Sequence, residues 1–211
     1  MENFPLDWHF LTFFGDSMLL LPTAFILFLV LLSSAATRRA GWQWGFIFGG
    51  VGAIVCASKL AFIGWGIGSA EYDFTGFSGH SALSASIWPA FLWLISAGSR
   101  PLLRRIAVLL GYLLPLAIGW SRLVIHAHST SEVVTGLILG LSASTLFLLL
   151  QRRSSPPRLG AVKTLILLAL PVLLMGHRQP APTQSLLEKI AVTLADRERP
   201  YTRADLHNLL K

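Results

Sequence analysis

Residues 118–140 read IGWSRLVIHAHSTSEVVTGLILG and place polar and titratable side chains between two apolar stretches. We expect one helix to end near Arg122, a short loop to hold His126 and His128, and a second helix to begin near Ser131. Charged side chains at membrane depth are costly, so by default they mark a functional site. The stretch therefore predicts two helices that meet at a small polar opening.

The composition of the whole chain is that of an integral membrane protein. Of its 211 residues, 54% are hydrophobic and 13% are charged, which lies outside the range of ordinary soluble domains. Apolar segments long enough to cross a bilayer occupy residues 17–36, 42–62, 81–98, 106–122, 131–150 and 161–176. The sequence predicts an all-α fold, a polytopic membrane helix bundle with about six transmembrane helices.

The basic residues predict the orientation of this bundle. The net charge of +7 does not indicate nucleic acid as a partner, because most of the Arg and Lys residues form short clusters between apolar segments. Every second connection holds such a cluster, namely Arg38 and Arg39, then Arg100, Arg104 and Arg105, then Arg152, Arg153, Arg158 and Lys163. Clusters of this kind are typical of cytoplasmic loops. We therefore expect a multi-pass protein of the bacterial inner membrane whose polar opening faces the periplasm.

Three regions follow from the pattern along the chain. Residues 1–16 lack a basic start and are rich in Phe and Trp, which indicates an interfacial segment and no cleavable signal peptide. Residues 17–177 form the transmembrane domain, and residues 178–211 form an extracytoplasmic amphipathic tail. Helical spacing relates the apolar residues Leu186, Leu187, Ile190, Ala191 and Leu194, and Thr202 with Asp205 could cap a final short helix. The tail could lie on the membrane surface or on the outer face of the protein itself.

Glu132 stands one helical turn beyond His128. A carboxylate at that position can accept a hydrogen bond from one imidazole nitrogen, which fixes the tautomer and leaves the other nitrogen free to attack phosphorus. Arg122, across the opening, would bind an oxyanion. The alternatives are that Arg122 is an interfacial anchor and that Glu132 is a charge favoured by the helix dipole.

A second polar element is the stretch GFSGHS at residues 76–81. Glycines around a serine at the start of a helix expose backbone N–H groups, so Ser78 and Gly79 are candidates for binding a phosphate. His80, when protonated, could donate a proton to a departing alkoxide. Taken alone, this stretch also fits a glycine-rich turn with a capping serine and a surface histidine.

A third element is Lys59, near the outer end of an apolar segment. A lysine there can simply extend its ammonium group to the lipid headgroups. Beside the two other elements on the same face, it becomes a candidate oxyanion ligand.

Together the three elements resemble the type-2 phosphatidic acid phosphatase superfamily. Its signature is Lys, six residues and Arg-Pro, then Pro-Ser-Gly-His, then Ser-Arg, five residues, His, three residues and Asp. The third part matches with Glu132 in place of Asp, and the second matches with Phe77 in place of Pro. In the first part Lys59 matches, but Gly66 and Ile67 stand where the superfamily has Arg-Pro.

The resemblance implies a role for each matched residue. His128 would be the nucleophile that forms a phosphohistidine, Glu132 would orient it and His80 would be the acid. The implied phosphate ligands are Lys59, Ser78, Gly79 and Arg122, and no metal or other cofactor is implied. His126 and Arg178 are candidates to replace the missing arginine.

The expected activity is removal of a terminal phosphate or pyrophosphate from a membrane lipid. Substrates that the resemblance suggests are polyprenyl pyrophosphate such as undecaprenyl pyrophosphate, phosphatidic acid, phosphatidylglycerophosphate and phosphorylated lipid A. One alternative is a lipid phosphotransferase, in which the phosphohistidine reacts with a lipid hydroxyl in place of water. Another is a non-catalytic lipid-binding protein that retains the fold, which the absent Arg-Pro favours.

Overall fold

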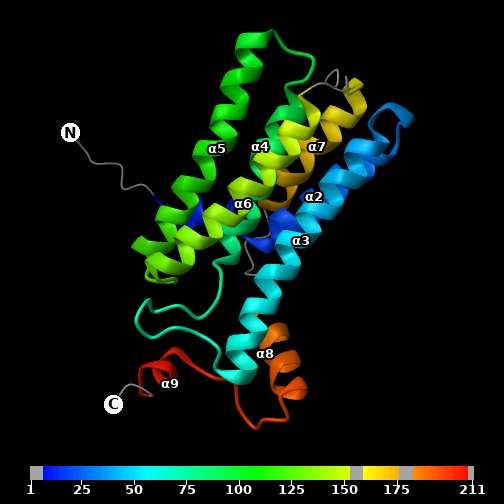
Figure 1. Cartoon of the computed structure of the whole chain (residues 1–211). Coiled ribbons are helices and arrows are strands. Elements are labelled where there is room, and N and C mark those ends of the chain that lie inside the picture. Colours follow the sequence, from blue (N-terminus) through cyan, green and yellow to red (C-terminus); the bar gives the residue numbers. More distant parts are fainter. Residues whose placement is uncertain (1–6, 153–158, 176–182, 209–211) are drawn as a thin grey trace, which may run out of the picture.

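The computed structural model describes residues 7–152, 159–175 and 183–208, and its regular secondary structure in this part of the chain is helical (Figure 1). This confirms the predicted all-α class. The helices are α1 (Trp8–Phe13), α2 (Ser17–Leu32), α3 (Ala35–Trp65), α4 (Gly79–Ile95), α5 (Pro101–Val124), α6 (Thr130–Gln151), α7 (Ala161–Met175), α8 (Thr183–Leu194) and α9 (Arg203–Asn208).

A helix is present at each of the six apolar ranges, but in the part of the chain that the structure describes four stretches are long and apolar enough to cross a membrane. These are Trp8–Leu32, Ala35–Trp65, Pro101–Val124 and Thr130–Gln151. Helix α4 has 17 residues and α7 has 15, which is short of the ~20 residues that a crossing needs. The structure therefore confirms a helical membrane protein, while the count of about six crossings stays a prediction.

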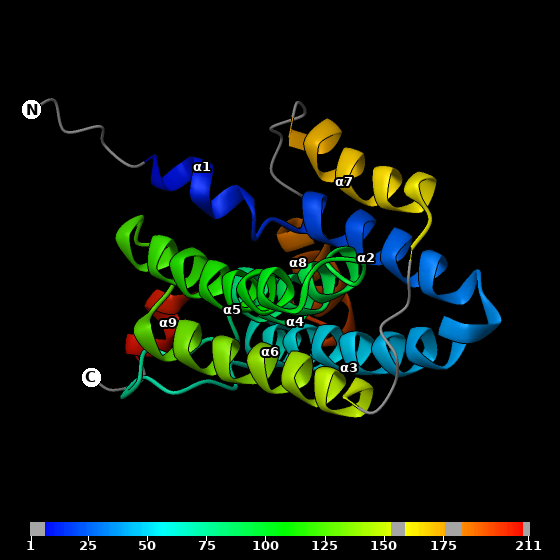
Figure 2. The same cartoon turned by 90° about the horizontal axis from the view of Figure 1, so that it is seen from above.

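Helix α4 lies at the centre of the bundle and packs against α2, α3, α5 and α6 (Figure 2). Its buried Trp88 and Phe91 join the main apolar core with Leu27 of α2 and Phe147 of α6. Helix α7 packs on the outer side of α2, and α1 packs against α5. The central position of α4 fixes its amino-terminal end, which carries the GFSGHS stretch.

Small residues let α6 approach α4 closely. A Cβ atom added at Gly136 would lie 2.9 Å from the carbonyl oxygen of Ser78, and one added at Gly140 would meet the carbonyl oxygen of Ala82. The backbone N–H of Ser78 also donates to the carbonyl oxygen of Glu132 at 3.1 Å. The first turns of α4 and α6, and with them two predicted parts of the site, are therefore held together.

Large apolar side chains are exposed along the outer faces of the long helices. They include Trp42, Phe46 and Ile54 on α3, Leu109, Leu113, Leu116 and Trp120 on α5, and Ile138, Leu146 and Leu149 on α6. An apolar surface of this extent is costly in water and is suited to lipid. The surface agrees with the composition in indicating a membrane protein.

After α7 the chain returns to the end of the bundle where α3 stops and α4 begins (Figure 1). Helix α8 packs against α3, and Ala191 is fully buried in a cluster with Phe62, Ile63 and Leu206. The expected cap of α9 is present, since Asp205 accepts from the backbone N–H of Thr202 at 2.9 Å. This part of the predicted tail lies on the protein's own surface.

Candidate active site

His128 lies in the loop between α5 and α6, and Glu132 lies in the first turn of α6. Ser129 caps this helix, because its hydroxyl accepts from the Glu132 N–H at 3.3 Å and its own N–H donates to the Glu132 carboxylate at 3.2 Å. Nδ1 of His128 lies 2.7 Å from Oε2 of Glu132. The hydrogen bond expected from the four-residue spacing is therefore present, and with the proton on Nδ1 the lone pair of Nε2 is available for reaction.

The carboxylate of Glu132 is fully buried and surrounded by donors. Its Oε1 accepts from the N–H of Thr75 at 2.9 Å, from the hydroxyl of Thr75 at 2.5 Å and from Nη2 of Arg203 at 2.8 Å. An ionised carboxylate is an acceptor only, so its chemistry matches these donors. One oxygen is held by the loop before α4 and by the tail, while the other is left to orient His128.

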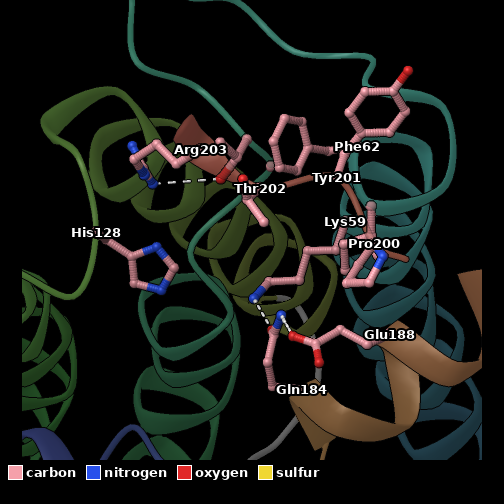
Figure 3. A pocket seen from close by; sticks show the side chains of 12 residues that line it. Lys59, Phe62, His128, Gln184, Glu188, Pro200, Tyr201, Thr202 and Arg203 are labelled. Atoms are coloured by element: carbon pink, nitrogen blue, oxygen red, sulfur yellow. Dashed lines mark hydrogen bonds between the residues drawn. The ribbon is translucent and has the colours of Figure 1, made fainter. Parts of the chain in front are cut away.

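A cavity of about 230 Å³ opens beside His128, several times the ~30 Å³ share of one water molecule. Lys59 lines it from α3, and its Nζ donates to Oε1 of Gln184 at 3.3 Å (Figure 3). Gln184 in turn donates to Glu188 at 3.0 Å. The cavity therefore joins a candidate nucleophile and a candidate oxyanion ligand to polar side chains of the tail.

His80 and Arg122 do not line this cavity but contact the amino-terminal segment. Nη1 of Arg122 donates to the hydroxyl of Thr12 at 3.0 Å, and Nε2 of His80 lies 3.7 Å from Oδ2 of Asp16. The Nε of Arg122 is buried, and no acceptor within the described residues reaches it. The positive charge of Arg122 acts on both His80 and His128, so both imidazoles lie within electrostatic range of the same guanidinium group.

Ser78 is fully buried and is the N-cap of α4. Its hydroxyl oxygen accepts from the hydroxyl of Ser81 at 3.0 Å and from the N–H of Ser81 at 3.4 Å. Gly79 is the first residue of the helix. The expected helix start is thus present, whereas neither residue lines the cavity beside His128.

The pKa of His128 lies below its ordinary value of 6.5. Burial lowers this pKa, and the positive charges of Lys59 and Arg122 lower it further, while the hydrogen bond with Glu132 acts in the opposite direction. The neutral imidazole, which is the form that can act as a nucleophile, is therefore favoured at neutral pH.

The two candidates for replacing the missing arginine differ in what the structure gives. His126 is exposed, adopts a left-handed backbone conformation with φ of 53° and does not line the cavity. Arg178 lies outside the described residues. Gly66, where the superfamily has arginine, ends α3 with φ of 69°.

Three contributors to the site were not predicted from the sequence. Thr75 and Arg203 bind the Glu132 carboxylate from the loop before α4 and from the tail. Asp16 caps α2 and faces His80. The only hint was the position of Asp16 just before an apolar run, which is where a helix N-cap belongs.

Within residues 7–152, 159–175 and 183–208, no three His, Cys, Asp or Glu side chains gather as ligands for a metal ion. The groups that gather here are cations, imidazoles and a carboxylate, a set suited to an anionic substrate.

The fold defines a helical membrane protein with a cluster of cations, imidazoles and a carboxylate, and comparison with known proteins gives the family. The model of the PAP2 superfamily matches residues 57–156, which contain all three sequence elements, and the chain belongs to this superfamily. The chain is also 52% identical over 207 residues to an uncharacterized 22.5 kDa protein in the cps region of Klebsiella pneumoniae, covering 96% of this chain and 98% of that protein. No solved structure matches the chain.

Proposed function

We propose that the protein is a lipid phosphatase that hydrolyses a terminal phosphate or pyrophosphate through a phosphohistidine on His128. The observation that carries the proposal is the 2.7 Å contact between Nδ1 of His128 and the fully buried carboxylate of Glu132. A buried carboxylate fixed by other donors gives the imidazole one orientation and one tautomer. Such an arrangement prepares a nucleophile and has no use in a passive lipid-binding site.

In the first step, Nε2 of His128 attacks the terminal phosphorus and the bond from phosphorus to the lipid oxygen breaks. Protonated His80 gives its proton to the departing oxygen, so the products are a phosphohistidine and the free lipid alcohol or monophosphate. Burial lowers the pKa of His80, and the carboxylate of Asp16, 3.7 Å from its Nε2, acts in the opposite direction, towards the protonated imidazole that this step requires.

In the second step, water attacks the phosphohistidine and the bond from phosphorus to Nε2 breaks. Neutral His80 accepts a proton from this water, inorganic phosphate leaves and both histidines return to their starting forms. In a phosphotransferase, a lipid hydroxyl would take the place of the water.

Lys59 and Arg122 are the best-supported ligands for the phosphoryl oxygens. Lys59 lines the cavity with His128, and the buried Nε of Arg122 lacks an acceptor among the described residues. Ser78 and Gly79 are less well supported as direct ligands, because the Ser78 hydroxyl is buried and contacts Ser81. The start of α4 still contributes the positive end of a helix dipole.

The exposed apolar faces of α3, α5 and α6 support a substrate that reaches the site from the bilayer. The alternation of basic clusters supports a site on the periplasmic side of a bacterial inner membrane. The substrate class is therefore a phosphorylated membrane lipid.

The test is phosphate release by the purified protein in detergent from a panel of lipid phosphates and lipid diphosphates. His128→Ala and His80→Ala are expected to abolish release, while His9→Ala, at an exposed position on α1, serves as the matched control. With a substrate that carries radioactive phosphorus, a phosphohistidine is detected as protein-bound label that is lost in acid and stable in base. His128→Ala should not acquire this label. Release that is the same in all four proteins would refute the proposal, and label passed to an added lipid acceptor would identify a phosphotransferase.

A further inference from the structure

The tail packs against the carboxy-terminal end of α3. The N–H of Tyr201 donates to the carbonyl oxygen of Ile63 at 2.9 Å, and Leu206 is buried in the apolar cluster with Phe62 and Ala191. This anchoring fixes the segment between α8 and α9 beside the candidate site.

Arg203, the first residue of α9, joins the tail to the loop before α4 and to the first turn of α6. Its Nη2 lies 2.8 Å from Oε1 of Glu132, and its Nη1 lies 2.5 Å from Oδ2 and 2.8 Å from the carbonyl oxygen of Asp73. The pKa of Asp73 is lowered: burial acts to raise it, but hydrogen bonds from Arg203 and His207 outweigh burial. The guanidinium is thus held by two carboxylates, one of which orients the candidate nucleophile.

The tail also occupies the place where the superfamily motif has its arginine. Gly66 stands at that position, and a Cβ atom added there would lie 3.2 Å from the ring of Tyr201. The left-handed φ of 69° at Gly66 also disfavours any residue with a side chain. A side chain at position 66 and the observed tail therefore compete for the same space, and the guanidinium next to Glu132 comes from residue 203.

We infer that Arg203 is a positioning residue of the proposed phosphatase, supplied by the carboxy-terminal tail to hold Glu132 in the orientation that fixes His128. The inference rests on the proposed function and adds the tail to the active site. Arg203 and Thr75 hold one oxygen of Glu132, which keeps the other oxygen directed at Nδ1 of His128.

Arg203 also contributes to the charge balance around His128. The other groups that face this histidine are Lys59 from α3, His80 from α4, Arg122 from α5 and Glu132 from α6. Removing the positive charge next to Glu132 leaves its negative charge less compensated. His128 then binds a proton at higher pH, so the nucleophile is lost at a higher pH than in the wild type.

The test compares Arg203→Gln and Arg203→Lys with Lys189→Gln, which removes a positive charge from an exposed position of the same tail. We expect Arg203→Gln to lower kcat about 10- to 100-fold with little change in KM. This is the loss typical of removing a group that orients a metal-binding histidine, and Arg203 acts on His128 in a comparable way through Glu132. Its acid limb in the profile of kcat/KM against pH should move up by about one pH unit. Arg203→Lys, which keeps a cation, should recover much of kcat and the wild-type acid limb, and Lys189→Gln should match the wild type.

Three outcomes would overturn the inference. They are an Arg203→Gln profile equal to that of Lys189→Gln, a pH-independent loss that lysine does not relieve, and a rise in KM at unchanged kcat. The first outcome would show that Arg203 has no role in catalysis. The second would show that Arg203 only supports folding, and the third would show that it binds the substrate directly.

A second measurement needs no substrate and separates this inference from the proposed function. Proton binding by His128 is followed by NMR of 15N-histidine-labelled protein in detergent, with His128→Ala to assign the signal. A higher pKa of His128 in Arg203→Gln, but not in Lys189→Gln, supports the inference even if the wild type releases no phosphate. An unchanged pKa overturns it even if the wild type is active.

Discussion

Replacing Glu132 with glutamine tests the central hydrogen-bond network of the site. The carboxylate accepts from His128, Ser129, Thr75 and Arg203 on its two oxygens. Glutamine has nearly the same shape, but one of its two terminal atoms is a donor. If that NH2 group faces His128, the ring must place its proton on Nε2 and the nucleophilic lone pair is lost. If it faces Arg203 instead, two donors are opposed in a fully buried position.

The first arrangement opposes fewer donors, because three donors from Thr75 and Arg203 face the other position, and it predicts a large loss of activity. A wrong tautomer at a catalytic histidine costs about 10⁴-fold in kcat, so we expect Glu132→Gln to lower kcat by about 10³- to 10⁴-fold. Unsatisfied buried donors should also lower the free energy of unfolding by about 1–3 kcal/mol.

Phosphate release in detergent gives kcat for this variant, and thermal unfolding of the same samples gives the stability. Glu71→Gln, at an exposed position of the loop before α4, is the control and should behave as the wild type. A folded Glu132→Gln that keeps more than about one tenth of the wild-type kcat would refute the role of Glu132 in orienting the nucleophile.

Burial and the charge of Lys59 lower the pKa of His128 from its ordinary value of 6.5, so this candidate nucleophile stays neutral to lower pH than an ordinary histidine. Activity should therefore extend to lower pH than the pKa of an ordinary histidine would allow. Lys59→Met removes a positive charge and should move the acid limb of the pH–rate profile up by about one pH unit. An unmoved acid limb would contradict this. Gly66→Ala should lower the free energy of unfolding by about 1–2 kcal/mol because φ is positive and should speed proteolysis of the tail, whereas an unchanged cleavage rate would speak against the proposed packing. Gly140→Ala should lower the thermal midpoint because its methyl group meets the backbone of α4, while Gly50→Ala, with open space around it, should not; equal midpoints would show that this close approach is wrong.

The helices and the His128–Glu132 contact were predictable because both are local in the sequence. Apolar runs of about 20 residues predict helices by length alone, and a four-residue spacing brings two side chains together within one turn. Hydropathy is less informative for α4, which matches a predicted range but is enclosed by other helices. Hydropathy cannot separate an enclosed helix from one that spans the membrane.

The contacts that complete the site could not be predicted, because they join distant parts of the chain. Arg203 and Glu132 are separated by 71 residues, and the tail packs on α3 through the cluster around Ala191. Asp16 and Thr12 reach His80 and Arg122 from the amino-terminal segment. The sequence shows that Gly66 stands where the motif has arginine. Only the packing of the tail shows that Arg203 lies next to Glu132.

The chain order of the site has a consequence for biosynthesis. Arg203 follows α1 to α8 in the chain, so its contact with Glu132 is formed only after every one of these helices has been translated. During insertion into the membrane, the buried carboxylate and His128 are already present while their guanidinium partner is still to come. Completion of the candidate site would then wait for the segment that follows α8, and a ribosome-bound intermediate that stops before this segment would have His128 and Glu132 without Arg203.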